Sequence, residues 1–258
     1  MNGIADAETL FAKRPILGVP IAVVSCDEAI RLCSAWARHR NSRAVFFASV
    51  HMVMEAHDHP DFLRLLNNAD MVNADGMPVV WALRAGGEKM ARRVCGPDTT
   101  TAMLAKAEKE KIPVGFYGGD QATLDALAAT VHERHPRLKI VFLESPPFRA
   151  LTPGEDAAAV DRIAASGAQL LFVGLGCPKQ ENWIMEHRGR VPCVMLGVGA
   201  AFDFIGGIKP RAPRWMMRCG LEWAFRLASE PKRLAWRYLK HNPRFVFLFL
   251  RQLLAARN

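Results

Sequence analysis

Short apolar runs alternate with amphipathic stretches through most of this chain, and that alternation limits the fold more than any other feature of the sequence. Continuous apolar runs of strand length, separated by helical patterns, favour a mostly parallel sheet with helices on both faces. The expected strands span residues 16–25, 44–49, 71–74, 114–117, 140–143, 170–174 and 191–197. The expected helices span residues 27–39, 52–67, 78–85, 97–109, 121–135, 154–166 and 179–187. The predicted fold class is therefore α/β, Rossmann-like in the broad sense.

Polar residues or glycines directly follow five of these expected strands. Ligands of open parallel sheets bind at the carboxyl ends of the strands, near the point where the strand order reverses. Because these ends meet at one edge of the sheet, the loops that follow them are predicted to form one site. The loop residues are Ser49 and His51; Asp75 and Gly76; Gly118, Gly119 and Asp120; Gly174 and Gly176; and Gly197 and Gly199.

The N-terminus shows no pattern of a secretory signal. Residues 1–14 alternate polar and small side chains, whereas a signal peptide has a positive start followed by roughly 7–15 apolar residues. The six cysteines form no Cys-x-x-Cys pair and no metal-binding spacing, which is typical of small buried residues in a reducing compartment. We predict a cytoplasmic protein.

Positive charge is concentrated at the C-terminal end. The chain has a net charge of +9, and the twelve Lys and Arg residues after residue 208 outnumber Glu222 and Glu230 by ten. Residues 1–207 are thus close to neutral, and we predict an α/β catalytic core at 1–207 followed by a basic helical appendage at 208–258. This asymmetry indicates an anionic partner for the appendage, whether nucleic acid, membrane or a phosphorylated ligand.

The appendage is also rich in aromatic and aliphatic residues. Its apolar run at 245–250 is far shorter than the roughly 20 residues that cross a bilayer. The flanking arginines and aromatics instead suggest helices in the membrane interface, with Trp215, Trp223, Trp236 and Tyr238 at the level of the headgroups. The alternative is a helical subdomain packed on the core with solvated arginines. No nucleic-acid-binding motif is visible, so we expect no nucleic-acid partner.

Two glycine turns begin like a dinucleotide-binding fingerprint. These turns, at 174–179 and 197–202, each lack the third glycine, and neither has the acidic residue expected about 20 positions later. They therefore give little support to a nicotinamide-dependent oxidoreductase. What remains is the close approach of backbone amides to a phosphate, which any nucleotide ligand could use.

Two further segments carry candidate chemistry. Asp75 lies on a turn at a strand end, where it is either a helix N-cap or the general base that removes a proton from an attacking sugar hydroxyl. The segment 176–181 combines a turn, a cation, an amide and a carboxylate at a helix start. One explanation of this combination is ordinary helix capping, in which Glu181 complements the helix dipole. The other is that Gln180 orients a sugar or acceptor hydroxyl while Lys179 supplies charge.

No Asp-x-Asp pair occurs in this sequence, although many nucleotide-sugar transferases use one to hold a divalent ion on the diphosphate. We therefore expect no metal and no cofactor. Charge developing on a leaving diphosphate must then be stabilised by arginines or helix N-termini. The segment 209–214, which includes Arg211 and Arg214, is a stiff cationic hinge in the right place to supply them.

These segments occur together, and in an order that resembles the WecG/TagA/CpsF family of bacterial glycosyltransferases. The similarity runs from about residue 16 to residue 240, nearly the whole chain. The matching segments are 73–81, 93–98, 116–120, 173–181, 197–203, 211–215, 221–223 and 230–233, which include Asn73 and Asp203. Because all of them appear in order, the resemblance is specific.

The resemblance implies an inverting, metal-independent transferase. Its donor is a UDP-sugar, and its acceptor is a sugar on a polyprenyl diphosphate at the inner face of the cytoplasmic membrane, in cell-surface or exopolysaccharide synthesis. Asp75 matches the base that the family is proposed to use, and Gln180 matches the glutamine of its Pro-Lys-Gln-Glu motif. Ser49 and His51 stand where members often carry Thr-x-Asn, so His51 is a departure that bears on sugar specificity and on proton transfer.

The appendage resembles the C-terminal segment with which the family is proposed to dock on the membrane and close arginines over the site. We expect Arg211, Arg214 and Arg237 to be among the groups that face the diphosphate. A nucleotide-binding oxidoreductase, a membrane- or nucleic-acid-binding protein without catalysis, and an inactive membrane scaffold are the alternatives. The sequence does not name the transferred sugar, and it leaves a homo-oligomer open.

Overall fold

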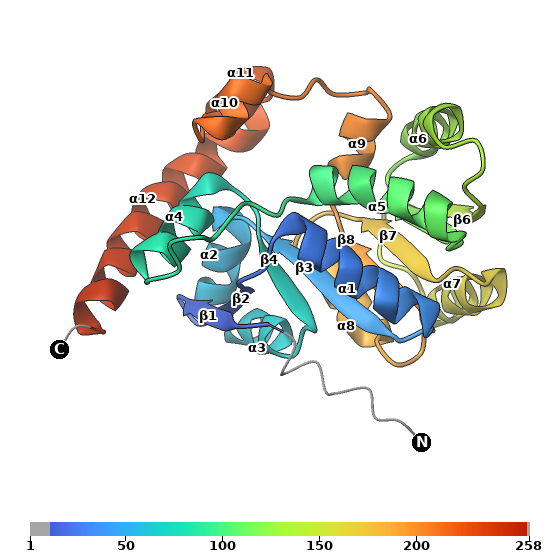
Figure 1. The fold of residues 1–258 in the computed structure, drawn as a ribbon, viewed down its shortest axis with the longest axis horizontal. Helices are drawn as coiled ribbons and strands as arrows, with labels where there is room; N and C mark the ends of the chain where they lie inside the picture. The colour runs from blue at the N-terminus through green and yellow to red at the C-terminus, as the bar shows by residue number, and fades with distance from the viewer. Residues whose placement is uncertain (1–10, 257–258) are drawn as a thin grey trace.

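The computed structural model describes residues 11–256, with the side chains of Arg214 and Arg218 outside the described part. A six-stranded parallel sheet forms its centre, with strand order β4-β3-β8-β7-β5-β6 (Figure 1). The predicted α/β class is confirmed. The strands are β3 (Arg43–Ala48), β4 (Met71–Ala74), β5 (Val114–Gly118), β6 (Ile140–Glu144), β7 (Leu170–Gly174) and β8 (Val194–Gly197).

Helices cover both faces of this sheet because successive side chains of its central strands point to opposite sides. In β3, Ala44, Phe46 and Ala48 belong to one buried apolar cluster, whereas Val45 and Phe47 belong to the other. The helices of the first cluster are α2 (Val50–Asp58), α3 (Pro60–Asn67), α4 (Met77–Ala85), α7 (Pro153–Ser166) and α8 (Lys179–His187). Those of the second are α1 (Cys26–Arg38), α5 (Gly96–Glu110), α6 (Gln121–Arg134) and α9 (Ala201–Ile205).

The prediction of one strand over residues 16–25 is wrong. Residues 13–22 form an antiparallel hairpin of β1 (Lys13–Ile16) and β2 (Val19–Ala22), separate from the parallel sheet. Leu17 and Gly18 form its two-residue turn with φ values of 48° and 87°. Positive φ at both central positions is the turn geometry that matches the twist of a hairpin, so the apolar run folds back on itself.

The helix predicted over residues 52–67 is two helices, α2 and α3. Pro60 lacks a backbone N–H and fits only the first turn of a helix, where no intrahelical donor is needed. Accordingly α3 begins at Pro60, and His59 adopts an extended conformation between the two helices. The break leaves α2 as a short, separate element beside the sheet.

The register of β3 and β4 places two loop residues next to each other. Ala48 pairs with Ala74, and the Asp75 backbone N–H donates to the Ala48 carbonyl oxygen at 3.0 Å. Ser49 and Asp75, the residues that follow these two strands, therefore emerge from adjacent positions at the carboxyl edge of the sheet. They lie near one end of the sheet, where β4 is the edge strand.

The C-terminal appendage consists of α10 (Arg214–Arg218), α11 (Glu222–Ser229) and α12 (Pro231–Ala255). The 25-residue α12 packs along α2 and buries Phe245 and Phe249 in the apolar cluster on that face (Figure 1). Near its end, the Gln252 side chain accepts from the Leu17 backbone N–H and donates to the Pro15 carbonyl oxygen, both at 2.8 Å. The appendage is thus docked on the core over the length of α12.

Candidate active site

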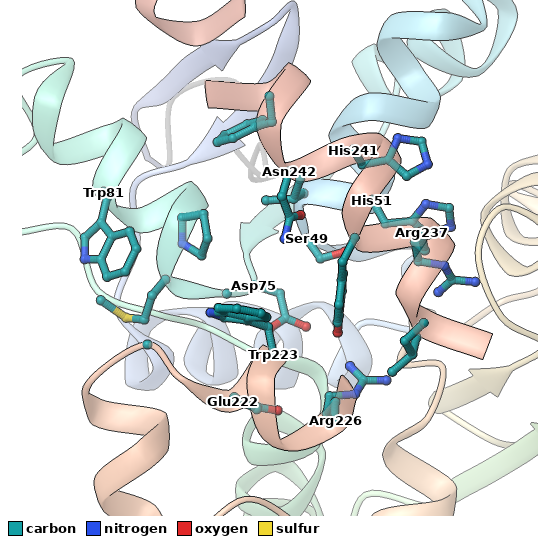
Figure 2. Close-up of a pocket in the computed structure, with 18 of the residues that line it drawn as sticks. Ser49, His51, Asp75, Trp81, Glu222, Trp223, Arg226, Arg237, His241 and Asn242 are labelled. Atoms are coloured by element: carbon teal, nitrogen blue, oxygen red, sulfur yellow. The ribbon is translucent and has the colours of Figure 1, made fainter. Parts of the chain in front are cut away.

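A cavity of about 350 Å³ lies where the appendage meets the carboxyl ends of β3 and β4 (Figure 2). Segments more than a hundred residues apart in the sequence form its two sides. The polar side chains of the core that line it are Ser49, His51, Asp75 and Arg93. Those of the appendage are Glu222, Arg226, Arg237, Tyr238, His241 and Asn242.

Asp75 is the acidic residue that the core contributes to this cavity. Gly76, with φ of 97°, turns the chain out of β4 into α4, a conformation that other residues rarely adopt. Burial raises the pKa of the Asp75 carboxyl to about 6, against the opposing charge of Arg93. Such a carboxylate is largely ionised at neutral pH, yet it is a stronger base than an ordinary aspartate.

Arg93 links Asp75 to the appendage. Its Nε lies 3.6 Å from Asp75 Oδ1, and its Nη2 lies 2.7 Å from Glu222 Oε2 at the start of α11. The guanidinium is largely buried, so this contact is less screened than a surface ion pair. One cation thereby ties the loop after β4 to the appendage across the cavity.

Two further arginines of the appendage line the cavity, Arg226 on α11 and Arg237 on α12. Neither forms an ion pair with any residue among the described positions. The Arg226 guanidinium lies 5.7 Å from the Phe204 ring, a cation–π distance, and its Nε is buried without a hydrogen-bond partner in the described chain. These two guanidiniums leave the cavity with positive charge that a ligand can neutralise.

Ser49 and His51 begin α2 on the core side. Ser49 occupies the N-cap position, and its side chain makes no capping hydrogen bond, which leaves the hydroxyl for other contacts. Burial lowers the pKa of His51 to about 3, and the positive charge of Arg237 acts in the same direction. The imidazole is therefore neutral at physiological pH and is a weaker base than the Asp75 carboxylate.

Aromatic residues give the cavity its apolar wall. Trp81 of α4 and Trp223 of α11 line it together with Tyr238, whose ring meets that of Trp223 edge-on at 6.2 Å. Gly220, between α10 and α11, has φ of 74°, and a Cβ there would lie 2.9 Å from Trp81. The close approach of this turn to the tryptophan requires a glycine and closes that side of the cavity.

Gln180 does not line the cavity; it is buried at the start of α8. Its Oε1 accepts from the backbone N–H groups of Gly176 and Gly199, both at 3.1 Å, and its Nε2 donates to Glu181 Oε1 at 2.8 Å. Burial raises the pKa of Glu181 to about 7. The amide of Gln180 therefore joins the two glycine turns after β7 and β8, where sequence reasoning expected contact with a hydroxyl.

Packing accounts for two of the glycines that were expected to line the site. Gly118 and Gly174 pair across β5 and β7, and a Cβ on Gly118 would lie 2.6 Å from the Gly174 carbonyl carbon. A Cβ on Gly174 would lie 2.7 Å from the Phe202 ring. Gly119 and Gly176, with φ of 72° and 81°, serve the turns that follow. None of these four lines the cavity.

The other expected substrate contacts also have partners outside the cavity lining. Asn73 is fully buried and donates to the Phe46 carbonyl oxygen at 3.2 Å, and Asp120 caps α6 by accepting from the Thr123 N–H. Asp203 pairs with Lys209, and Arg211 pairs with Asp98, both at 2.7 Å. Lys179 is exposed at the start of α8, and the side chain of Arg214 lies outside the described part of the structure.

The structure thus brings together Ser49, His51, Asp75, Gly76 and Arg237 from the predicted set. Sequence reasoning did not single out five other polar residues of the cavity: Arg93, Glu222, Arg226, His241 and Asn242. Arg93 opens one of the motifs that carried the family resemblance, which was an available signal. Glu222 lies in another of those motifs, at 221–223. Arg226, His241 and Asn242 had no such signal, because only the docking of the appendage turns them toward the core.

Comparison with known proteins finds relatives that share a name. Three similar proteins are each named N-acetylglucosaminyldiphosphoundecaprenol N-acetyl-beta-D-mannosaminyltransferase. The one from Bacillus spizizenii is 32% identical, with 76% of this chain and 74% of the relative aligned. The one from Staphylococcus aureus MW2 is 29% identical over 92% of this chain and 91% of the relative. The one from Bacillus subtilis is 28% identical over 74% and 73%.

The family comparison covers both the core and the appendage. The matching family model is described as the glycosyl transferase WecG/TagA/CpsF family, and the match extends over residues 14–258. The chain therefore belongs to the WecG/TagA/CpsF family of glycosyltransferases.

Proposed function

We propose that this enzyme transfers a sugar from a UDP-sugar to a saccharide on a polyprenyl diphosphate, with inversion at the anomeric carbon. One observation carries the proposal: a carboxylate of raised pKa, Asp75, shares a partly closed cavity with Arg226 and Arg237, two cations without ion-pair partners in the described chain. Inverting transfer needs a base for the attacking hydroxyl and positive charge for the leaving diphosphate. The cavity supplies both.

In this mechanism Asp75 removes the proton of the acceptor hydroxyl as that oxygen attacks the anomeric carbon. The bond from the sugar to the diphosphate breaks in the same step, and the proton passes to the Asp75 carboxylate. Arg93, which contacts both Asp75 and Glu222, holds the base in place. Ser49 and His51, on the core side of the cavity, are proposed to bind the substrates beside it.

Arg226 and Arg237 are proposed to stabilise the UDP that leaves. Guanidiniums already in place within a partly closed site meet developing charge without reorganisation. Since the sequence has no Asp-x-Asp pair to hold a divalent ion on the diphosphate, we propose that these arginines fill that role. The proposed transfer then needs no Mg²⁺ or Mn²⁺.

The names of the relatives guide the choice of acceptor. Each relative is named for transfer of N-acetylmannosamine to N-acetylglucosaminyl-diphospho-undecaprenol. We propose an acceptor of the same chemical class here, in the synthesis of a cell-surface polysaccharide. His51 stands where members of the family often carry Asn, so the sugar that this enzyme transfers need not be N-acetylmannosamine.

A lipid-linked acceptor requires the cavity to approach a membrane, and α12 has a surface suited to that. No helix within residues 11–256 is both long and apolar enough to cross a bilayer. Exposed apolar residues instead lie along one side of α12, at positions that a helix of 3.6 residues per turn brings together, with basic residues beside them. We name this surface the apolar stripe. The stripe consists of Trp236, Leu239, Val246, Phe247, Leu250 and Leu254.

We propose that the apolar stripe lies in the headgroup region of the cytoplasmic face of the membrane. An amphipathic helix with aromatic residues on one side and Lys or Arg beside them is typical of interfacial binding. Trp236 is 75% exposed and Phe247 is 61% exposed, although both are large and apolar. The same helix carries Arg237 in the cavity wall, so docking the stripe would bring the site to the lipid-linked acceptor.

Replacement of the proposed base tests the reaction itself. With a panel of UDP-sugars, a lipid-diphosphate-sugar acceptor in vesicles and no added Mg²⁺ or Mn²⁺, we expect acceptor-dependent UDP release. Asp75→Asn should lower kcat by about 10²–10⁴-fold, the usual contribution of a general base. If kcat is unchanged in the variant, proton removal belongs to another group. If no UDP is released from any donor, the proposed donor class is wrong.

The stability of the same variant separates a catalytic role from a structural one. In the native state the pKa of Asp75 is about 6, above its ordinary 3.8. The ionised carboxylate therefore costs the native state stability as pH rises between these values, and the full cost applies above them. Neutral Asn removes that cost, so the Tm of Asp75→Asn at neutral pH should equal or exceed that of the wild type. A large fall in Tm would instead indicate a structural role.

The pH dependence of transfer provides an independent check on the base. Only the ionised carboxylate of Asp75 accepts a proton, so kcat/KM should rise with pH through about 6 and level off above it. The residual activity of Asp75→Asn should lack this ionisation. A wild-type profile that stays flat from well below pH 6 to neutral pH would contradict the assignment.

The roles of the cavity arginines can be tested against a nearby arginine of the appendage that lies outside the cavity. We expect Arg237→Gln and Arg226→Gln each to lower kcat/KM by roughly 10–100-fold, the value of one hydrogen bond to a charged group. Arg233→Gln is the matched control, because Arg233 lies one turn before Arg237 and pairs with Glu230 at the surface at 2.7 Å. Equal losses in all three variants would point to overall charge and not to contact with the diphosphate.

Removing apolar area from the stripe should weaken membrane binding and spare the cavity. In co-sedimentation with phosphatidylglycerol vesicles, we expect the double replacement Trp236→Ser and Phe247→Ser to reduce binding by roughly ten-fold or more. The affinity for the UDP-sugar should stay the same, since neither residue lines the cavity. Phe148→Ser is the control, because Phe148 is just as exposed but lies on the core. Undiminished binding in the double variant would rule out the stripe as the docking surface.

A further inference from the structure

Three side chains with metal-binding atoms converge where α12 crosses α2. His51 and Glu55 lie one turn apart on α2, and His241 reaches them from α12; Figure 2 shows the two histidines side by side. Their ring centroids are 5.3 Å apart. One ligand atom from each of the three residues can be chosen so that all three lie within 4.8 Å of one another. This is the one such group of His, Cys, Asp or Glu within the described residues.

The polar atoms of this group are close together but do not satisfy one another. Both His51 Nδ1 and His241 Nε2 lie 3.7 Å from the same Glu55 oxygen, beyond normal hydrogen-bond length. His51 Nδ1 is buried and has no hydrogen-bond partner in the described chain. A buried polar atom without a partner is uncommon, and a bound ion is one explanation for it.

The spacing of these atoms suits an ion bound between them. Zinc binds histidine nitrogen and carboxylate oxygen at about 2.0–2.2 Å in tetrahedral geometry, which puts neighbouring ligand atoms roughly 3.4 Å apart. The two distances of 3.7 Å to Glu55 are close to that value. All three ligand atoms lie within 4.8 Å of one another, so the side chains would draw closer together around a bound ion.

The packing of the two helices holds the group in register. One turn further along the same interface, Arg244 of α12 forms two hydrogen bonds with Asp58 of α2, at 2.7 and 2.9 Å. Glu55 and Asp58 are three residues apart on α2, as His241 and Arg244 are on α12, so one alignment of the helices produces both pairs. The buried Phe245 packs against the core beside them. Rigid elements therefore present the ligands.

We propose that His51, Glu55 and His241 bind a divalent first-row transition metal, best represented by Zn²⁺, which fastens the appendage to the core beside the active site. Two imidazoles and one carboxylate favour zinc over the oxygen-preferring Mg²⁺ and Ca²⁺. Arg237 and Lys240 place positive charge near His51, which does not attract a cation. The ion must therefore be held by its coordination bonds and not by net negative charge. Three protein ligands leave one position for a non-protein ligand.

His51 and His241 also line the cavity, but no step of the proposed transfer passes through the ion. Its direct effect is on α12: a bond from His241 to an ion held by α2 makes release of the appendage costlier. Since α12 carries Arg237, the ion would favour the closed cavity. The metal site can be tested by binding and stability alone, so its failure would be distinguishable from failure of the proposed transfer.

Metal binding to the full-length protein is the first test. After removal of metals with a chelator and exchange into chelator-free buffer, titration with Zn²⁺ should show one tight site per chain. At free Zn²⁺ 100-fold above its Kd, we expect Tm to rise by roughly 5–10 °C. Co²⁺ should give the visible absorption of four-coordinate cobalt, and Zn²⁺ should abolish it. Absence of a tight site, or cobalt spectra of a six-coordinate ion only, would overturn the proposal.

Matched variants locate the site. Glu55→Gln and His241→Asn should weaken Zn²⁺ binding by more than about 100-fold. Removing a residue that only hydrogen-bonds to a metal ligand already costs about 10–100-fold in affinity, and removing the ligand itself should cost more. His59→Asn is the control: His59 Nδ1 also lies 3.6 Å from a Glu55 oxygen, but its ring is exposed and outside the group. If His59→Asn weakens binding as much as His241→Asn, the ion belongs to a surface pair on α2 and the proposal is wrong.

A second measurement needs no variant and so does not depend on whether one folds. Pulsed electron paramagnetic resonance of the Cu²⁺-loaded wild type counts coordinated imidazoles through their remote nitrogens. Two equivalent imidazoles are expected from His51 and His241. One imidazole, or none, would exclude a site that joins the two helices.

Discussion

The packing of α12 against α2 is the interaction on which the rest of the site depends, because without it the cavity has no second side. Phe245 and Phe249 bury apolar surface on the core, at a gain of roughly 1.5–3 kcal/mol for each fully buried aromatic side chain. The bidentate Arg244–Asp58 pair is half exposed and adds specificity of register more than stability. With α12 in this register, Arg237, Tyr238 and His241 all face the cavity.

Docking of the appendage also affects the pKa of Asp75 in the core. Asp75 follows an edge strand, and Glu222 and Arg226 of the appendage line the cavity beside it. Covering this carboxylate raises its pKa, and Glu222 of α11 raises it further, while Arg93 and Arg226 hold it near 6. Arg93 contacts both carboxylates, so it limits their repulsion and links the proposed base to the element that covers it. Basicity and closure of the site are therefore consequences of the same contact.

The sequence predicts the core well because the apolar pattern of a buried parallel strand is local. The run at 170–174 coincides with β7, and the polar residues that follow β3 and β4 do meet at one edge. The hairpin was missed because Leu17-Gly18 is a weaker turn signal than Asn-Gly. Gln180 was correctly placed at the start of a helix, but no local pattern shows that its amide bonds the turns at Gly176 and Gly199.

The sequence does not predict the side of the cavity that the appendage forms, because that side depends on contacts between residues far apart in the chain. Arg226 and Arg237 belong to a tail whose positive charge has several explanations, and only the structure shows which side chains turn inward. The burial pattern along α12 shows which side of the helix faces the core. Residues 234, 241, 245 and 249 are buried, while 236, 239, 247 and 250 are exposed. One helix thus has a face for the core and a face for the proposed membrane, with Arg237 between them. Movement of this helix away from the core would disrupt the apolar packing and the cavity together. The proposed membrane contact and the candidate active site therefore both depend on the position of α12.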